Sequence, residues 1–176
     1  MCGLQWFQVV ESGEKWYKMV EAIPILEEGD CMLNGEFNHS IDAKGRLIIP
    51  SKFRESLGEH FVITKGMDGC LFVYPDDEWS AFEEKLRELP LTNKNARDFK
   101  RIFLGSAVDG ELDKQGRVLI SSALRAYAGL EKEVVLAGVL DKIEIWDKKA
   151  WDAHSEEVEA DIDDIASDME DLGLSI

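Results

Sequence analysis

The chain contains an internal repeat, which constrains its fold more than any other sequence feature does. The segment Ile41–Arg54 reads IDAKGRLIIPSKFR and returns as Leu112–Arg125, which reads LDKQGRVLISSALR. Identical residues recur 71 positions apart, as Asp42 and Asp113 do. Such self-similarity indicates two copies of one structural unit. Because a unit of roughly 45 residues is close to the lower limit for independent folding, we expect both copies to share one core.

Each copy is predicted to form a hairpin, a short helix and two further strands. In the first copy the turn Asp42–Gly45 joins two apolar segments, and aspartate and glycine are typical turn residues. The short helix is expected to begin after Pro50 and to end at Gly58. The expected elements are the strands Phe37–Ile41, Leu47–Ile49, Phe61–Thr64 and Cys70–Tyr74 and the helix Ser51–Leu57. We therefore expect an α+β fold with two domains, residues 36–79 and 107–151.

Helices are expected between and after the two domains. Residues 80–106 have apolar side chains at helical spacing, interrupted by Pro90, and are predicted to form a helical linker. A last helix is expected to begin at Asp147, and its acidic part covers residues 152–176. Its apolar residues recur at intervals of four and three: Val158, Ile162, Ile165, Met169 and Leu172. We expect this stripe to pack within the chain or its oligomer, although a partner protein could also bind it.

The net charge of −16 would normally argue against binding of nucleic acid, but the acidic residues are concentrated at the two ends of the chain. Residues 153–176 contain nine acidic residues and no lysine or arginine, and residues 1–31 carry a charge of −4. Residues 32–152 therefore carry only −3. Within them, basic residues gather near the two turns: Lys44, Arg46, Lys52, Arg54, Lys114, Arg117 and Arg125. A local basic patch can bind phosphate whatever the total charge is.

The sequence contains no pattern typical of an enzyme or a metal site. His39, His60 and His154 lack metal-ligand spacing, alone or with Cys70, so we expect no metal and no cofactor. Motifs of serine hydrolases, P-loops and dinucleotide-binding proteins are absent. A catalytic pair of carboxylates from the two turns is conceivable, but the arginine near each would lower its pKa rather than raise it. No apolar run is long enough to cross a membrane, so we expect no membrane partner.

The repeated pattern D-x-x-G-R, followed by a hydrophobic triplet, resembles the MraZ family of bacterial regulators, which contain two tandem AbrB-like (SpoVT-AbrB) domains. The segments that carry the resemblance are EFNHSIDAKGRLIIPSKFR (36–54), TKGMDGCLFVYP (64–75), LPLTNKNAR (89–97), LDKQGRVLI (112–120) and YAGL (127–130). One D-x-x-G-R motif would be a weak signal, but two in register within this frame are specific. Ser121 departs from the family pattern, which has a proline there as at Pro50, so a weaker start of the second short helix is expected.

The resemblance implies a fold, an assembly and a function. The fold would be a swapped-hairpin AbrB-like β-barrel made from both repeats, with linking helices and a C-terminal helix. Subunits would assemble into a homo-oligomeric ring that binds direct repeats in double-stranded DNA. The ring would repress the division and cell-wall gene cluster, including the regulator's own gene, in the cytoplasm on the nucleoid. The three cysteines also fit a reducing cytoplasm without disulfides.

This interpretation assigns the contact with DNA to the two turns, since an arginine can pair with phosphate or guanine through its planar guanidinium group. The candidate DNA-binding residues are Arg46, Arg117, Lys44 and Lys114, and the candidate positioning residues are Asp42, Gly45, Asp113 and Gly116. The alternative is that each Asp–Arg pair only stabilises its own hairpin. Arg54 and Arg125, on the short helices, are expected on a solvated face.

The sequence is also compatible with a second class of function. The chain could be a ring-forming interaction scaffold that binds another protein through its acidic C-terminal helix. The dependence of binding on salt distinguishes the two classes. For binding to phosphates, the logarithm of the binding constant falls linearly with the logarithm of the salt concentration.

Residues 1–31 show no convincing fold signal and are predicted to be a non-native extension, translated from the operator itself. Codon choice allows GTGG-type tetramers at a spacing of ten nucleotides within the codons of Gln5–Trp6, Val9–Val10, Ser12–Gly13, Lys15–Trp16 and Met19–Val20. Ten base pairs is about one turn of B-DNA, so these tetramers would lie on one face. Met32 would then be the true start, and residues 1–31 would have no role in either domain. The alternative is that codon degeneracy alone permits the pattern.

Overall fold

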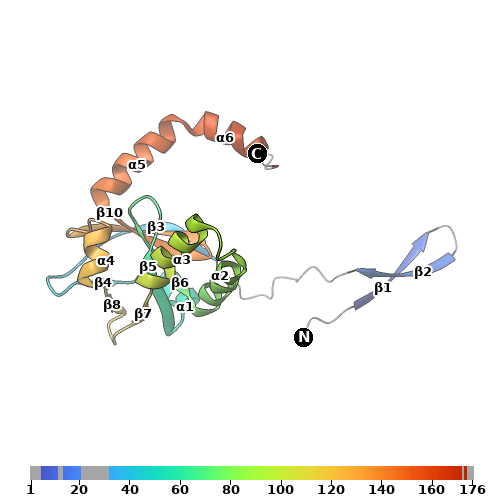
Figure 1. Cartoon of the computed structure of the whole chain (residues 1–176), viewed down its shortest axis with the longest axis horizontal. Coiled ribbons are helices and arrows are strands. Elements are labelled where there is room, and N and C mark those ends of the chain that lie inside the picture. Colours follow the sequence, from blue (N-terminus) through green and yellow to red (C-terminus); the bar gives the residue numbers. More distant parts are fainter. Residues whose placement is uncertain (1–4, 12–13, 21–31, 172, 174–176) are drawn as a thin grey trace. The chain divides into compact units, whose positions relative to one another are not determined.

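The computed structural model describes residues 5–11, 14–20, 32–171 and 173 of the chain, which forms two units, residues 1–31 and residues 32–176. In the first unit, β1 (Gln5–Glu11) and β2 (Glu14–Val20) pair as an antiparallel hairpin (Figure 1). This hairpin corrects the expectation that residues 1–31 carry no fold signal. The two strands are rich in aromatic and β-branched residues, which favour extended structure. The rest of residues 1–31 lies outside the described residues.

The second unit is built on an antiparallel six-stranded sheet in the order β3-β9-β10-β6-β5-β7. Its strands are β3 (Leu33–Ser40), β5 (His60–Lys65), β6 (Leu71–Pro75), β7 (Val108–Glu111), β9 (Glu133–Leu140) and β10 (Lys142–Asp147). The first strand of each repeat pairs with the other repeat, because β3 lies beside β9 and β7 lies beside β5. Neither repeat therefore completes its own sheet.

Two short strands, β4 (Arg46–Ile48) and β8 (Arg117–Leu119), also pair across the repeats and form a separate two-stranded ribbon. The predicted hairpin between Phe37–Ile41 and Leu47–Ile49 is therefore wrong beyond its turn, since only a single bridge joins Ile41 to Leu47. The reason is competition from the other repeat. β3 pairs with β9 along all eight of its residues, and β4 pairs with β8.

Helices connect the strands in the order that the sequence predicts. They are α1 (Ser51–Leu57), α2 (Asp76–Glu88), α3 (Lys94–Ser106), α4 (Ser122–Tyr127), α5 (Lys148–Ala160) and α6 (Ile162–Asp171). α1 follows Pro50 and ends at Gly58, as predicted. The hydroxyl of Ser121 accepts a hydrogen bond from the amide of Leu124 at 3.3 Å, so a serine caps α4 where the family pattern has a proline.

The C-terminal segment forms two helices rather than the single helix that the sequence predicts. The chain turns at Asp161, between α5 and α6. Aspartate is a poor residue for the interior of a helix and a good one near its start, which explains the break in a stretch this acidic. Of the apolar stripe, Ile162 and Ile165 are 52% and 36% exposed, and Leu172 lies outside the described residues.

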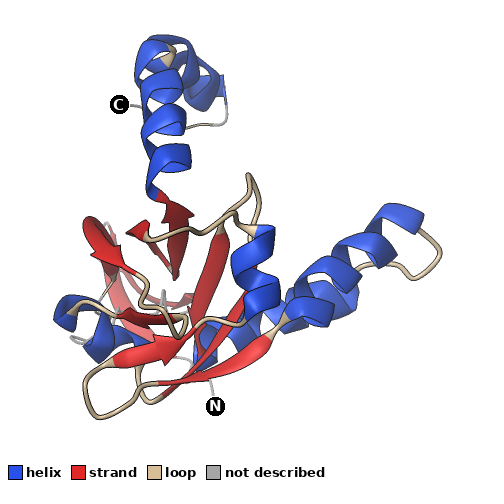
Figure 2. Cartoon of the chain, turned by 90° about the vertical axis from the view of Figure 1, so that its left-hand side faces the viewer, coloured by secondary structure: helices blue, strands red, loops and turns tan. Residues whose placement is uncertain are grey.

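The six-stranded sheet has apolar clusters on both faces. One cluster joins the sheet to the ribbon and to α1 and α4, and it includes Leu47, Phe53, Val118 and Leu124. The other joins the sheet to the helical pair α2–α3, and it includes Phe72, Trp79 and Phe103. Figure 2 shows helices beside the strands of the sheet. Because both repeats contribute to the first cluster, they share one core, as their size predicts. Within the described part of the chain, no helix is both long and apolar enough to span a membrane.

Candidate nucleic-acid interface

Each repeat presents a turn that is closed in the same way. The carbonyl of Asp42 accepts a hydrogen bond from the amide of Gly45 at 2.9 Å, and the amide of Asp42 donates to the carbonyl of Arg46 at 2.9 Å. The two equivalent distances in the second turn are both 2.8 Å. The φ angles of Gly45 and Gly116 are 82° and 72°, in the left-handed region that glycine adopts without steric cost. The motif therefore needs glycine at this position.

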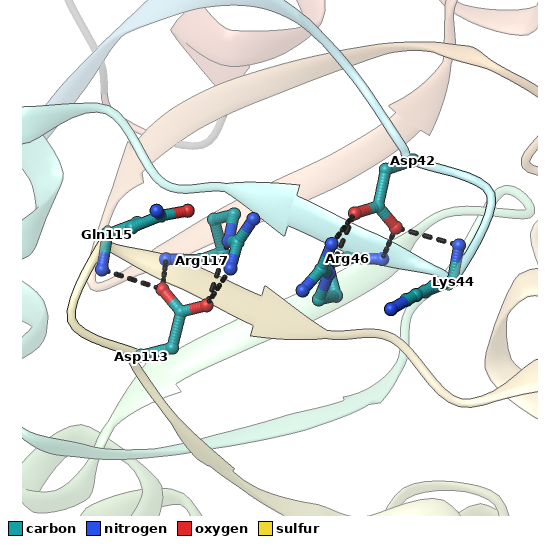
Figure 3. A network of polar contacts seen from close by, with 6 residues as sticks. All are labelled: Asp42, Lys44, Arg46, Asp113, Gln115 and Arg117. Atoms are coloured by element: carbon teal, nitrogen blue, oxygen red, sulfur yellow. Dashed lines mark hydrogen bonds and ion pairs between the residues drawn. The ribbon is translucent and has the colours of Figure 1, made fainter.

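The carboxylate of Asp42 organises the first turn (Figure 3). Its Oδ1 accepts hydrogen bonds from the backbone amides of Lys44 at 2.8 Å and Arg46 at 3.0 Å. Its Oδ2 accepts from Nε of Arg46 at 2.7 Å and lies 2.6 Å from Nη2 of the same residue. One aspartate thus fixes both the backbone of the turn and the direction of the arginine side chain.

The second turn repeats this arrangement. Oδ1 of Asp113 accepts from the amides of Gln115 at 2.8 Å and Arg117 at 3.1 Å, and its Oδ2 accepts from Nε and Nη2 of Arg117 at 2.8 and 2.6 Å. The hydrogen bond from the Arg117 side chain lowers the pKa of Asp113 to about 2, and Arg46 does the same for the pKa of Asp42. Both carboxylates are therefore ionised at neutral pH.

Each arginine keeps part of its guanidinium group available to an outside ligand. The side chains of Arg46 and Arg117 are 32% and 23% exposed. Their Nε and Nη2 atoms face the aspartate, whereas Nη1 has no hydrogen-bond partner among the described residues. Because guanidinium carries five N–H donors in a planar fork, the remaining donors can pair with a phosphate or with guanine.

The ribbon links the two turns, which lie at its opposite ends. Arg46 pairs in register with Leu119, and Ile48 pairs with Arg117. Figure 3 shows the two antiparallel strands side by side, with one Asp–Arg pair at each end of the ribbon. Asp42 and Arg46 are 71 positions from Asp113 and Arg117 in the chain, but the structure places all four on one ribbon and its two turns.

The two candidate lysines lie in the turns and are both exposed. They do not occupy equivalent positions, because Lys44 corresponds to Gln115 and Lys114 corresponds to Ala43 in the repeat. Each turn therefore carries one lysine next to its Asp–Arg pair, but at a different point of the loop.

The expectation that Arg54 and Arg125 lie on a solvated face is wrong. Both side chains are only partly exposed. Nε of Arg54 donates a hydrogen bond to the carbonyl of Ile49 at 2.7 Å, and Nε of Arg125 donates to the carbonyl of Ile120 at 3.2 Å. Each arginine therefore folds back from its helix to the end of the preceding strand.

From there, each arginine reaches the turn of the other repeat. A Cβ atom added to Gly116 would lie 2.5 Å from Cζ of Arg54, and one added to Gly45 would lie 3.2 Å from Cζ of Arg125. The amide of Ile49 also donates to the carbonyl of Gly116 at 2.9 Å, with an equivalent bond in the other repeat. Arg54 and Arg125 thus support the turns, a role that the sequence did not predict. The available signal was their recurrence eight positions after Arg46 and Arg117.

Other reactive groups in the described residues do not form a second site. No three histidine, cysteine, aspartate or glutamate side chains gather there as a metal site would require. Cys70 is buried, its Sγ donates to the carbonyl of Met67 at 3.2 Å, and burial raises its pKa to about 12. A thiol in this state is protonated at neutral pH and is a poor nucleophile.

Two tandem α+β repeats that share one core and exchange their strands define the class of protein, a two-repeat α+β protein. The family model of the MraZ protein matches residues 32–102 and, a second time, residues 103–172. The chain is 57% identical over 144 residues to the transcriptional regulator MraZ of Lachnoclostridium phytofermentans, which covers 82% of this chain and 99% of that protein. It is 53% identical over 143 residues to the transcriptional regulator MraZ of Acetivibrio thermocellus, which covers 81% of this chain and 100% of that protein. The chain belongs to the MraZ family and is a transcription regulator.

Proposed function

We propose that the chain is a repressor that binds double-stranded DNA sequence-specifically through the β4–β8 ribbon and its two turns. One observation carries the proposal: Arg46 and Arg117 are each fixed by an aspartate, with guanidinium donors left over at a partly exposed position. A side chain that is already fixed loses little conformational freedom on binding, so more of the contact energy appears as affinity. Lys44 and Lys114, beside the arginines, add charge that attracts phosphate.

The proposed target is the control region of the division and cell-wall gene cluster, including the chain's own gene. The proposed binding sites are GTGG-type direct repeats about ten base pairs apart, which repeat about once per turn of B-DNA. The proposed assembly is a homo-oligomeric ring of swapped-hairpin barrels, in the cytoplasm on the nucleoid, with one repeat for each subunit. The exposed Ile162 and Ile165 support an oligomer, because apolar side chains on a surface helix gain stability when a partner covers them.

A second candidate function is a ring-forming scaffold that binds another protein through its acidic C-terminal helices. The same exposed stripe on α6 favours it, together with the nine acidic residues of residues 153–176. In this case the partner would carry a basic and partly apolar surface, and the ribbon would not be needed for binding.

We also propose the domain boundaries given by the repeat, which are residues 36–79, 80–106, 107–151 and 152–176, and that residues 1–31 are translated operator. The family match that begins at residue 32, and the separate unit formed by residues 1–31, support this proposal. The gene should then show GTGG at nucleotides 15, 25, 35 and 45 and ATGG at nucleotide 55 of this reading frame. N-terminal sequencing of the native protein should begin at or just after Met32. A native protein that begins at Met1, or codons that break the spacing, would contradict the proposal.

A gel shift with the upstream region of the chain's own gene, including the codons of residues 5–20, tests the proposed function. We expect a shifted complex with this duplex and none with an unrelated duplex of equal length at the same concentration. The logarithm of the binding constant should fall linearly with the logarithm of the salt concentration, with a slope of about −0.9 for each contacted phosphate. Equal binding to both duplexes would contradict sequence-specific recognition, and binding to neither would leave the scaffold as the better account.

A further inference from the structure

The outer face of the ribbon carries two apolar side chains that the core does not use. Ile48 is 42% exposed and Leu119 is 64% exposed. Side chains alternate along a strand, and the neighbours Leu47 and Val118 are 0% and 2% exposed. Because the inner residues fill the core, Ile48 and Leu119 share the opposite face with the two arginines.

The register sets these four side chains in an alternating pattern. Arg46 lies opposite Leu119, and Ile48 lies opposite Arg117. The arginines therefore occupy one diagonal of the ribbon, and the aliphatic side chains occupy the other. Aliphatic groups exposed between fixed cations suit a ligand surface that is anionic and also presents small apolar groups.

We propose that Ile48 and Leu119 contact the C5-methyl groups of thymine in the major groove of DNA, so that the ribbon reads thymine directly. This inference rests on the proposed DNA-binding function. It names thymine as a base that is recognised and Ile48 and Leu119 as the residues that contact it. The major groove is about 12 Å wide and admits a two-stranded ribbon, and the thymine methyl group is an apolar contact on its floor. Neighbouring strands lie about 4.8 Å apart, so β4 and β8 can enter the groove together. Arg46 and Arg117 supply the charge that the phosphate-lined groove attracts.

A second copy of the chain is a poorer occupant of this face. A two-fold contact would place the same patch against itself. The four arginines of the two patches would then lie in one interface, and like charges removed from water destabilise such a contact. DNA brings the opposite charge to the same position.

The test compares two duplexes of the same sequence, the region that encodes residues 5–20, one with thymine and one with deoxyuridine at every thymine position. Deoxyuridine lacks only the C5-methyl group and keeps every hydrogen-bonding group. Binding of the full chain is expected to weaken about fourfold for each methyl contact that is lost, as expected for one buried methyl-sized group. The double variant Ile48→Ser/Leu119→Ser should bind both duplexes equally. Leu91→Ser, which alters a residue that is 71% exposed and lies outside the ribbon, should keep the discrimination of the unaltered chain.

The outcomes separate this inference from the proposed function. If the unaltered chain binds both duplexes equally while Arg46→Ala weakens both, DNA binding stands and thymine reading is overturned. If the unaltered chain binds neither duplex, both are overturned. Discrimination that persists in the double variant, or a change in its oligomeric state by light scattering, would assign the two side chains to another contact. The comparison of duplexes with the unaltered chain needs no variant, so it decides the matter even if the double variant does not fold.

Discussion

The guanidinium group of Arg54, on α1 of the first repeat, lies against Gly116 in the turn of the second repeat. Arg125 and Gly45 have the reciprocal relationship. Each turn of the candidate interface is therefore supported by a side chain from the other repeat. The two turns form one structural unit, although 71 residues separate them in the chain.

Replacing Arg54 by alanine should perturb the distant turn more than the near one. The variant loses the hydrogen bond from Nε to the carbonyl of Ile49, so the free energy of unfolding should fall by about 0.5–1.5 kcal/mol. Amide chemical shifts should change most at residues 113–117, which Arg54 covers, and less at residues 42–46. Arg87→Ala, which removes a side chain that is 76% exposed, is the control. Shift changes concentrated at residues 42–46 would contradict the reciprocal arrangement.

Replacing Gly116 by alanine should cost stability through the backbone and displace Arg54. A side chain in the left-handed region costs about 1–3 kcal/mol. Gly129→Ala is the matched control, because Gly129 also has a positive φ, 59°, but has nothing within 4 Å of an added Cβ. Chemical denaturation of both variants, alone and with Arg54→Ala, measures the difference. Arg54→Ala should cost less in the Gly116→Ala background than in the unaltered chain, and strict additivity would show that the two residues do not interact.

The carboxyl group of Asp42 should stay ionised down to about pH 2. The Arg46 side chain holds its pKa at about 2, against 3.8 for an unperturbed aspartate. Because the pKa is lowered in the folded state, the stabilisation is complete above about pH 4 and is lost as the pH falls towards 2. In Arg46→Ala, carbon-detected NMR should show the pKa of Asp42 rising towards 3.8, while Asp113 stays at about 2 as an internal control. Titration of Asp42 near 3.8 in the unaltered chain would contradict the ion pair.

A single repeat should not fold as a monomer. β3 of the first repeat pairs with β9 of the second, and Leu47 shares a core with Val118. A chain of residues 32–102, one of the two segments that match the family, should give little structure by circular dichroism or should dimerise to replace the missing repeat. A stable monomer of this segment in light scattering would show that the exchange between repeats is not required.

The sequence predicts the elements of the fold well because their signals are local. Pro50 and Gly58 bound α1, and the size of the repeat predicts a shared core. The pairing of strands is not local, and here the prediction of a hairpin fails. The turn at Asp42 forms as expected, but the strands on either side of it pair with the other repeat, β3 with β9 along eight residues and β4 with β8.

The candidate site also contains contacts that sequence spacing predicts and contacts that it does not. Asp42 and Arg46 are four residues apart around a glycine, so their contact is predictable from spacing, as it is in the second repeat. Arg54 looks like any basic residue on a short helix. Its burial depends on the turn of the other repeat, which only the three-dimensional pairing places beside it. The exposure of Ile48 likewise depends on which face of β4 meets the core.

The binding of DNA by the two turn arginines is tested most directly by fluorescence anisotropy with a labelled duplex from the upstream region of the chain's own gene. The double variant Arg46→Ala/Arg117→Ala is compared with Arg87→Ala/Arg101→Ala, which removes the same charge from side chains that are 76% and 70% exposed on α2 and α3. We predict a loss of about 1–3 kcal/mol for each contact in the first variant and little change in the second. Both variants should stay folded, since an exposed ion pair contributes only about 0–1 kcal/mol to stability. If the first variant binds the duplex as tightly as the unaltered chain, the assignment of DNA binding to Arg46 and Arg117 is contradicted.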